Sequence, residues 1–276
     1  MRFDPVAKLF CRPERLTALK NGEPRFPFCL QLDITNQCNL DCKYCYWDKN
    51  GGREPAIKLS RARALLQTCA DAGVRSVIWT GGGEPLMHED FPDIIRIAHS
   101  LGLRSGLFTN GTLISDSALA HVIVHCCDWV RVNCSAAHAA SYKAIHGADY
   151  FNTVPAGLER LKRARREAGT ACDLGIGFIV TKQNLQDMEP MARAVRRLGL
   201  DFIQFKHDNT QITSVEYLAF WYAEAVPAAR ALATAAPAPP AVDFSTRDYG
   251  PPYPFSRCRM GHFTVVADPG GTLYGC

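Results

Sequence analysis

The sequence lacks three features that would point to common classes of protein. Its formal net charge is only +4 over 276 residues, and the charged residues are spread along the chain rather than gathered in a basic stripe. A nucleic-acid partner is therefore not expected. No apolar run approaches the length of a membrane span, and the first ten residues, MRFDPVAKLF, contain no apolar stretch suited to export. We therefore expect neither a membrane partner nor secretion.

Cysteine, in contrast, is plentiful. The chain has 12 cysteines, but at 276 residues with 47% hydrophobic content it is too large to be a small domain stapled by disulfides. Without an export signal, the expectation is a cytoplasmic protein whose thiols are reduced or bound to metal. The length allows one large domain with an appendage.

One stretch, residues 31–47 (QLDITNQCNLDCKYCYW), carries three cysteines close together. Alternating bulky and polar residues from Leu30 predict a strand that runs into a loop. An aromatic residue, Tyr44, stands just before the third cysteine of this loop. The spacing is C-x3-C-x2-C, formed by Cys38, Cys42 and Cys45. Three thiolates on one tight loop suit three irons of a [4Fe-4S] cubane, whose fourth iron can then bind a small molecule.

Two other interpretations of these cysteines are open. A structural zinc site would need a fourth cysteine or histidine at short range, and usually contains C-x2-C pairs. The next histidine along the chain is His88, and the first spacing does not match a zinc ribbon. Three unrelated buried thiols are the remaining alternative.

The spacing and the aromatic residue together resemble the signature C-x3-C-x-aromatic-C of the radical S-adenosylmethionine (radical SAM) superfamily. The resemblance implies that the open iron chelates the amino and carboxylate groups of SAM. It further implies that an electron from the cluster cleaves the sulfonium and yields a 5′-deoxyadenosyl radical. An electron donor such as flavodoxin or ferredoxin is the implied protein partner.

Strand and helix patterns alternate along most of the chain. Six strands are predicted, at residues 30–35, 75–80, 104–109, 129–134, 173–181 and 201–206. The predicted helices between them cover 60–72, 91–101, 116–125, 154–168 and 187–198, the third with Ser115 as its N-cap. This alternation implies parallel strands, with functional loops at their carboxyl ends. An open sheet and a partial barrel both fit, and the resemblance implies a partial (β/α)6 TIM-like barrel.

The predicted barrel covers residues 29–210 and follows an irregular lead-in at 1–28. Residues 211–240 are expected to form a helix and a proline-rich linker, and the tail at 241–276 a hairpin around residues 268–271. Cys258 and Cys276 in this tail resemble the beginning of a SPASM or twitch extension, which implies an auxiliary iron–sulfur cluster. Because the cysteines that normally follow are absent, we expect the natural protein to continue beyond Cys276. Two alternatives are open. Other residues complete the auxiliary site, or there is no such cluster and the tail covers the barrel mouth, with both cysteines packing.

Two segments after the second and third strands resemble SAM-binding segments of the family. The sequence TGGGEP at residues 80–85 matches the GGE motif, which implies that Gly82, Gly83 and Glu84 hold the methionyl amino group. Glycines also let a backbone approach a ligand closely. Asn110, in the TNGT segment at residues 109–112, either supports the barrel rim or faces SAM or the substrate.

The later strands supply the remaining candidates. Asn133 and Ser135 follow the fourth strand on one side, where relatives often have Ser and Asp for the SAM ribose and carboxylate. Arg131 lies deeper on that face and is either a carboxylate partner or a satisfied core arginine. Ile179 belongs to a Gly/Ile segment that resembles the one packing on adenine, with core packing as the alternative.

The sixth strand ends in a polar cluster expected to bind a polar substrate: Gln204, Lys206, His207, Asp208 and Asn209.

From these features we predict a radical SAM enzyme with a SPASM/twitch-like tail. It would abstract a hydrogen atom from a polar small molecule, such as a sugar, aminocyclitol or nucleoside, in a biosynthetic pathway. The polar mouth and a lead-in too short for a peptide-binding domain favour this substrate class over the alternative, a peptide-modifying maturase. A non-catalytic iron–sulfur electron carrier is the hypothesis of another class, and the GGEP segment argues against it because a carrier needs no amino-acid clamp.

Overall fold

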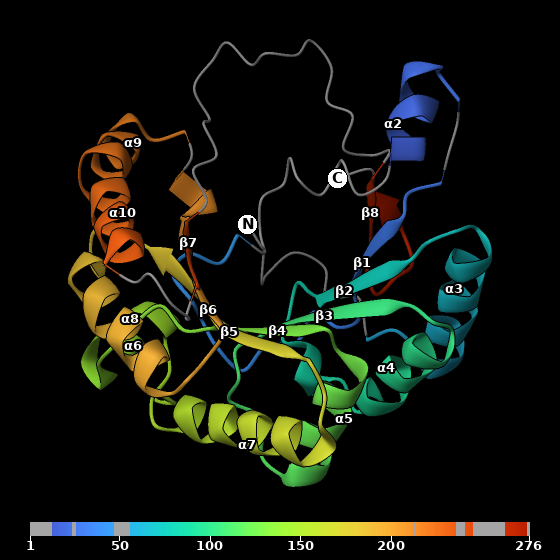
Figure 1. Cartoon of the computed structure of the whole chain (residues 1–276), viewed down its shortest axis with the longest axis horizontal. Helices are drawn as coiled ribbons and strands as arrows, with labels where there is room; N and C mark the ends of the chain where they lie inside the picture. Colours follow the sequence, from blue (N-terminus) through green and yellow to red (C-terminus); the bar gives the residue numbers. More distant parts are fainter. Residues whose placement is uncertain are drawn as a thin grey trace.

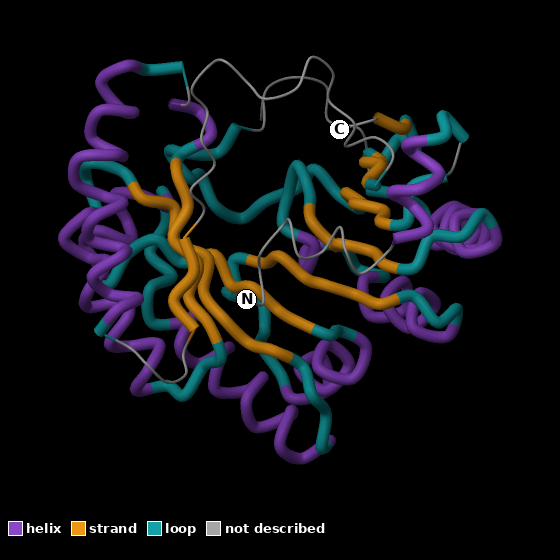
Figure 2. Tube along the Cα trace, turned by 45° about the horizontal axis from the view of Figure 1, so that its top comes forward, coloured by secondary structure: helices purple, strands orange, loops and turns teal. Residues whose placement is uncertain are grey.

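The computed structural model describes residues 13–23, 26–46, 56–211, 213–235, 241–244 and 263–274. Within these ranges one sheet runs in the order β7-β6-β5-β4-β3-β2-β1-β8-β9. Neighbouring strands are parallel except for β8 and β9. Figure 1 shows the sheet with its helices around the outside, and Figure 2 shows that the strands form a curved sheet with most helices on its convex side.

The six predicted strands form the middle of this sheet. They are β1 (Cys29–Asp33), β2 (Ser76–Thr80), β3 (Arg104–Thr109), β4 (Trp129–Asn133), β5 (Asp173–Val180) and β6 (Phe202–His207). The five predicted helices between them are α3 (Leu59–Asp71), α4 (Phe91–Ser100), α5 (Ser117–Cys126), α7 (Thr153–Ala168) and α8 (Met188–Arg197). The predicted partial (β/α)6 barrel is therefore confirmed.

One predicted helix cap is wrong. The N-cap of α5 is Asp116, whose carboxylate accepts a hydrogen bond from the backbone nitrogen of Leu119 at 2.9 Å. Ser115 lies one residue too early and its hydroxyl donates to the Asp116 carboxylate instead. Asp116 is the stronger cap because a charged oxygen accepts the free N–H of the first helical turn.

The structure adds elements that the sequence pattern did not predict. Helix α6 (Ala139–His146) lies between β4 and α7, and β7 (Ala241–Phe244) pairs with β6. The expected hairpin forms from β8 (Thr264–Ala267) and β9 (Leu273–Tyr274), but β8 also pairs with β1.

The remaining helices are α2 (Pro13–Lys20), α9 (Val215–Phe220), a π-helical turn (Trp221–Ala225), α10 (Val226–Thr234) and the 3-10 turns Pro85–Met87, Leu185–Asp187 and Asn209–Gln211. Both tail cysteines, Cys258 and Cys276, lie outside the described residues.

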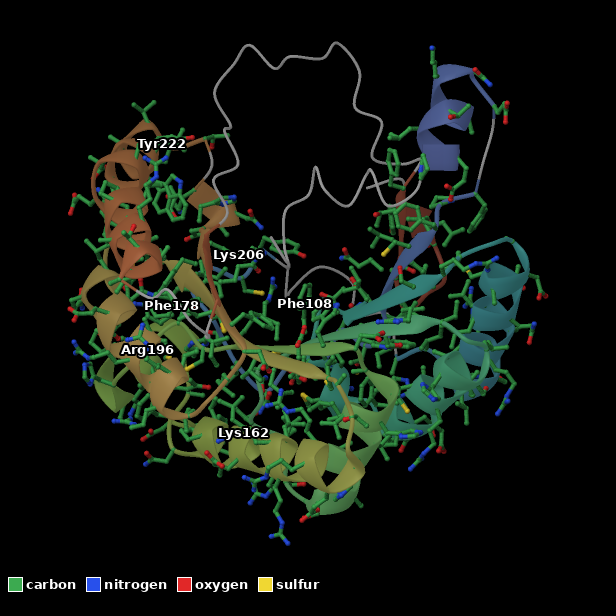
Figure 3. All side chains as sticks on the ribbon, in the orientation of Figure 1. Phe108, Lys162, Phe178, Arg196, Lys206 and Tyr222 are labelled. Carbon is green, nitrogen blue, oxygen red and sulfur yellow. The ribbon has the colours of Figure 1, made fainter. Side chains whose placement is uncertain are left out.

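Alternation along the strands separates the core from the inside of the barrel. In β4, Val130 and Val132 are fully buried, whereas Trp129, Arg131 and Asn133 are half-buried. The buried set packs against the surrounding helices, so the half-buried set faces the concave side. In Figure 3, Phe108 and Lys206 lie on this concave side, whereas Arg196 and Tyr222 lie on the outer helices. Within the described part of the chain, no helix combines the length and apolarity that crossing a membrane requires.

Candidate active site

The cysteine loop follows β1 at the carboxyl end of the barrel. Cys38 is exposed, and Cys42 and Cys45 are half-buried. A backbone hydrogen bond of 3.1 Å from the nitrogen of Cys45 to the carbonyl of Cys42 closes a turn between these two residues. The loop therefore presents its three thiols from one short, turned segment at the barrel mouth.

The C-terminal end of helix α6 contacts this loop through backbone hydrogen bonds. The backbone nitrogens of Asp41 and Lys43 donate to the carbonyls of His146 and Ile145, at 3.0 and 2.9 Å. Gly147 ends the helix with φ +72°, and a Cβ atom there would lie 2.7 Å from the Asp41 carbonyl oxygen. A glycine is thus required at the end of α6, because both its backbone angle and its contact with the loop exclude a side chain.

The donor chemistry of the loop fits an iron–sulfur cubane better than a single metal ion. Among the described residues, no three His, Cys, Asp or Glu side chains converge closely enough to hold one ion. A zinc site needs such convergence. A cubane does not, because each cysteine thiolate binds a different iron at its own corner.

A buried histidine ties the loop to the end of β4. His146 is fully buried, and its Nε2 accepts a hydrogen bond from the backbone nitrogen of Ser135 at 3.0 Å. Its Nδ1 lies 3.2 Å from the sulfur of Cys42 and 3.4 Å from the hydroxyl oxygen of Tyr44. Burial lowers the pKa of His146 to about 4, so the ring is neutral at physiological pH.

Ser135 and Tyr44 belong to the same network. The Ser135 hydroxyl donates to the Tyr44 hydroxyl at 3.1 Å and accepts from the backbone nitrogen of Ile179 at 2.9 Å. Asn184 adds a bond from its amide nitrogen to the Ser135 carbonyl oxygen at 2.7 Å. Because Ser135 is fully buried and bonded on all sides, its position suits holding the loop more than the expected contact with SAM.

The glycine-rich loop after β2 packs directly on the start of the cysteine loop. The backbone nitrogens of Gly83 and Glu84 donate to the carbonyls of Thr35 and Gln37, at 3.1 and 2.7 Å. A Cβ on Gly83 would lie 2.0 Å from the Gln37 carbonyl oxygen, a distance that no side chain can tolerate. The two segments singled out in the sequence therefore form one continuous surface.

The Glu84 side chain points into the protein. It is only 3% exposed, and its carboxylate accepts hydrogen bonds from the backbone nitrogens of Leu86 and Asn110 and from the hydroxyl of Thr109. Burial raises the pKa of Glu84 to about 7, although these bonds oppose the shift. The carboxylate thus joins the loops after β2 and β3, which differs from the expected direct contact with an ammonium group.

Asn110 is also occupied within the protein. Its amide nitrogen donates to Asn39 at 2.8 Å, and its amide oxygen accepts from the backbone nitrogen and hydroxyl of Thr112, at 2.9 and 2.7 Å. Asn39 in turn donates to the Thr112 hydroxyl at 2.8 Å. Of the two roles predicted for Asn110, these bonds favour support of the barrel rim.

Sequence reasoning missed a carboxylate that does face this region. Asp33, the last residue of β1, is 8% exposed and accepts a backbone hydrogen bond from Gly82. Its Oδ1 atom is buried and has no hydrogen-bond partner among the described residues. Burial, together with the nearby Asp268, raises the pKa of Asp33 to about 6. The signal in the sequence was its place in β1, on the same side of the strand as Gln31 and opposite to Leu32.

The barrel interior holds a cation deeper than the loops. The Arg131 guanidinium lies 3.6 Å above the centre of the Phe108 ring and donates to Gln204 at 2.7 Å. Its Nε atom and the Oδ1 of Asn133 are buried without hydrogen-bond partners in the described part of the chain. Glycine at position 177 leaves space for these side chains, because a Cβ there would lie 2.8 Å from Oδ1 of Asn133 and 2.9 Å from Nε of Arg131. Burial lowers the pKa of Arg131 to about 10, which leaves it charged at neutral pH.

The polar cluster predicted at the end of β6 is divided between different surroundings. Gln204 and Lys206 are half-buried on the inner side, and Asn209 is exposed. His207 is buried with its ring edge-on to Trp221 at 5.9 Å, and Asp208 is buried beside Tyr217, whose hydroxyl accepts from its backbone nitrogen. The prediction that the whole cluster lines the mouth is therefore wrong, because alternation turns His207 toward the helices.

Comparison with known proteins identifies the family of this chain. A family model described as the radical SAM superfamily matches residues 32–195. A tungsten-containing aldehyde ferredoxin oxidoreductase cofactor-modifying protein of Pyrococcus furiosus is 28% identical over 174 residues, 62% of this chain and 49% of that protein. The mycofactocin maturase MftC of Mycobacterium ulcerans is 30% identical over 178 residues, 63% of this chain and 45% of that protein.

Solved structures show the same fold. Streptococcus suis SuiB bound to the precursor peptide SuiA matches 99% of this chain and 65% of that chain, with a TM-score of 0.74 and 15% identity. The chain spans about half the length of the curated relatives that it matches, with 49% and 45% of the two above. Since the family match covers more than half of the sequence, the chain belongs to the radical SAM superfamily, whose enzymes use a [4Fe-4S] cluster and S-adenosylmethionine.

Proposed function

We propose that the chain is the catalytic core of a radical SAM enzyme that modifies a peptide. The observation that carries this proposal is the match over 99% of the chain to the fold of SuiB bound to the precursor peptide SuiA. A relative named as a maturase supports it. The short lead-in no longer argues against a peptide, because the chain spans only part of these relatives.

The residues divide the work as follows. Cys38, Cys42 and Cys45 would hold the cluster, which with SAM supplies a 5′-deoxyadenosyl radical for hydrogen abstraction. The backbones of Gly82 and Gly83 shape the surface where the methionyl group would lie. Asp33, with a buried oxygen that has no partner among the described residues, is the acceptor best placed for an ammonium group.

The inner face of the barrel would serve the rest of SAM and the substrate. Asn133 and Ile179, at the carboxyl ends of β4 and β5, are half-buried and suit the ribose and adenine. Arg131, with Gln204 beside it, offers a desolvated cation to a carboxylate, such as an acidic side chain of a peptide. Lys206 adds a second cation on this side. The chain's task is to orient a C–H bond and exclude water.

Iron binding and spectroscopy test the cluster. Protein reconstituted without oxygen should bind about four irons at the cysteine loop and, once reduced, show a paramagnetic signal that changes when SAM is added. Replacing Cys38, Cys42 and Cys45 by Ala should remove these four irons and the signal, whereas Cys126→Ala, in the helix layer, should keep both. A triple variant that retains the SAM-sensitive signal would contradict the assignment of these three cysteines as cluster ligands.

Substrate class is tested by product analysis. Reduced enzyme and SAM are incubated with short peptides encoded beside the gene, and mass spectrometry follows the peptide and 5′-deoxyadenosine. A peptide that loses hydrogens while 5′-deoxyadenosine forms supports the proposal. The Arg131–Gln204 pair also suits a polar anionic small molecule. Formation of 5′-deoxyadenosine that responds to such molecules and to none of the peptides would favour that second candidate.

A further inference from the structure

The protonation of the His146 ring is fixed by its surroundings. A backbone N–H can only donate, so the 3.0 Å contact with Ser135 requires that Nε2 of His146 be the unprotonated nitrogen. A neutral imidazole then carries its proton on Nδ1. Nδ1 lies 3.2 Å from the Cys42 sulfur and 3.4 Å from the Tyr44 oxygen. Because sulfur is the larger atom, the approach to Cys42 is the closer of the two.

The ring has little freedom to leave this position. It stacks on Tyr142 with ring centres 4.3 Å apart and planes 26° apart. The backbone of His146 accepts from Asp41, the residue before Cys42, so one residue holds both the thiol and the main chain of the loop. Tyr44 packs edge-on against the ring at 5.7 Å, and Ser135 donates to its hydroxyl.

We propose that His146 donates a hydrogen bond from Nδ1 to the Cys42 sulfur when Cys42 binds the cluster, and thereby raises the cluster's reduction potential. The inference rests on the proposed function and adds a positioning residue to it. A donor at a ligating sulfur stabilises the more negative, reduced cluster, because it offsets the added charge. Delivery of an electron to SAM depends on this potential, so His146 would set how strong a reductant the partner must be.

The main experiment compares potentials in reconstituted protein without SAM. His146→Phe removes the donor but keeps a ring to stack on Tyr142. Tyr142→Phe is the matched control, because the Tyr142 hydroxyl is buried with no hydrogen-bond partner among the described residues and the variant keeps the same ring contact. Each midpoint potential is measured by redox titration followed by electron paramagnetic resonance.

We expect His146→Phe to become harder to reduce by about tenfold in the equilibrium constant, which is about 59 mV for one electron. Tyr142→Phe should match the wild type. Equal potentials in the wild type and His146→Phe would overturn the inference while leaving the cluster assignment intact. A wild-type protein that takes up no cluster would instead refute the proposed function, and this inference with it.

A second measurement does not need a loaded cluster. Nitrogen-15 NMR of histidine-labelled apoprotein reports which ring nitrogen carries the proton. The His146 signals are identified by their loss in His146→Gln, whose amide oxygen can still accept from Ser135. Protonation at Nδ1 supports the inference. Protonation at Nε2 would overturn it, even if His146→Phe fails to bind iron.

Discussion

Oε2 of Glu84 lies 2.6 Å from the backbone nitrogen of Asn110, and Oε1 lies 2.6 Å from the Thr109 hydroxyl. These bonds join the loop after β2 to the loop after β3. Since the first of these loops also packs on the cysteine loop, one buried carboxylate controls the relative position of three segments at the barrel mouth. If Glu84 instead contacted the SAM ammonium group directly, its substitution would weaken SAM binding without lowering the stability of the apoprotein.

Glu84→Gln separates these two roles. A glutamine amide would turn one acceptor into a donor that faces the donors of Leu86, Thr109 and Asn110. We expect the free energy of unfolding of the apoprotein to fall by about 1.5–3 kcal/mol, the range for hydrogen bonds to charged groups. SAM affinity, measured by calorimetry, should also fall at least tenfold as the loops shift. Glu89→Gln, at an exposed position of the same segment, is the control. Weaker SAM binding with unchanged stability would instead support a direct contact.

Gly83→Ala tests the contact between the glycine loop and the cysteine loop. The new Cβ would lie 2.0 Å from the Gln37 carbonyl and 2.6 Å from the Asn36 carbonyl carbon, so one backbone must move. We expect SAM binding to be lost and iron content after reconstitution to fall. Gly169→Ala, at φ +63° with open space around it, carries only the backbone cost of roughly 1–2 kcal/mol. If both variants bind SAM equally, the contact has no functional role.

Features that depend on residues close together in the sequence could be predicted, whereas features that depend on contacts between distant residues could not. Strands β1 to β6 and the cysteine, GGE and TNGT segments carry local patterns, so their order and their meeting at one end were predictable. Helix α6 was missed because its first residues, Ala139–Tyr142, are mostly small or polar and give no clear apolar stripe. Pairing of β8 with β1 was missed because more than two hundred residues separate them.

Side-chain roles were less predictable than positions. Glu84 and Asn110 stand at the expected places, yet their orientation depends on donors from other loops. His146 has no signature in sequence, because its function arises only when α6 packs beneath the loop. Strand alternation places Asp33 on the inner side of β1, but its burial and its oxygen without a partner among the described residues are visible only in the structure. Such features depend on three-dimensional neighbours.

The auxiliary cluster predicted for the tail stays a prediction, since Cys258 and Cys276 lie outside the described residues. If they bind iron, reconstituted protein should hold more iron than one cubane, and a Cys258→Ala/Cys276→Ala variant should lose the excess. Iron and sulfide analysis of both proteins measures this. Identical iron content in the two proteins would leave the tail cysteines with a packing role.

Asp33 predicts an unusual dependence of stability on pH. Its pKa is raised from 3.8 to about 6 in the folded protein, so the folded state binds the proton more tightly than the unfolded state. Stability of the apoprotein should therefore fall as pH rises from about 4 to 6, by at most about 3 kcal/mol from this group. Asp33→Asn should be more stable than the wild type at pH 8 in chemical denaturation, and less dependent on pH.

Asp149→Asn, at an exposed position, serves as the control for this experiment. SAM should raise the stability of the wild type more than that of Asp33→Asn, because its ammonium group would pair with the Asp33 carboxylate. Equal stabilisation of the two proteins by SAM would contradict the proposed role of Asp33 as the ammonium acceptor.

Replacement of Arg131 should change the stability of the apoprotein and the binding of the substrate in opposite directions. Its guanidinium is held by Phe108 and Gln204, and no carboxylate among the described residues perturbs it electrostatically. Burying a charge without an opposite charge is costly, and replacement by an apolar side chain of similar length is often stabilising. We therefore expect Arg131→Met to raise the free energy of unfolding of the apoprotein by about 1–3 kcal/mol, measured by chemical denaturation.

The same substitution should impair capture of an anionic group. Peptide-dependent formation of 5′-deoxyadenosine should need at least tenfold more peptide, which corresponds to about 1.4 kcal/mol of binding free energy. Arg196→Met, on the outer surface of α8, should change neither property (Figure 3). Loss of stability with unchanged peptide dependence would identify Arg131 as a satisfied core residue. A gain in stability together with weaker binding would mean that the barrel keeps a destabilising cation because the substrate supplies its partner.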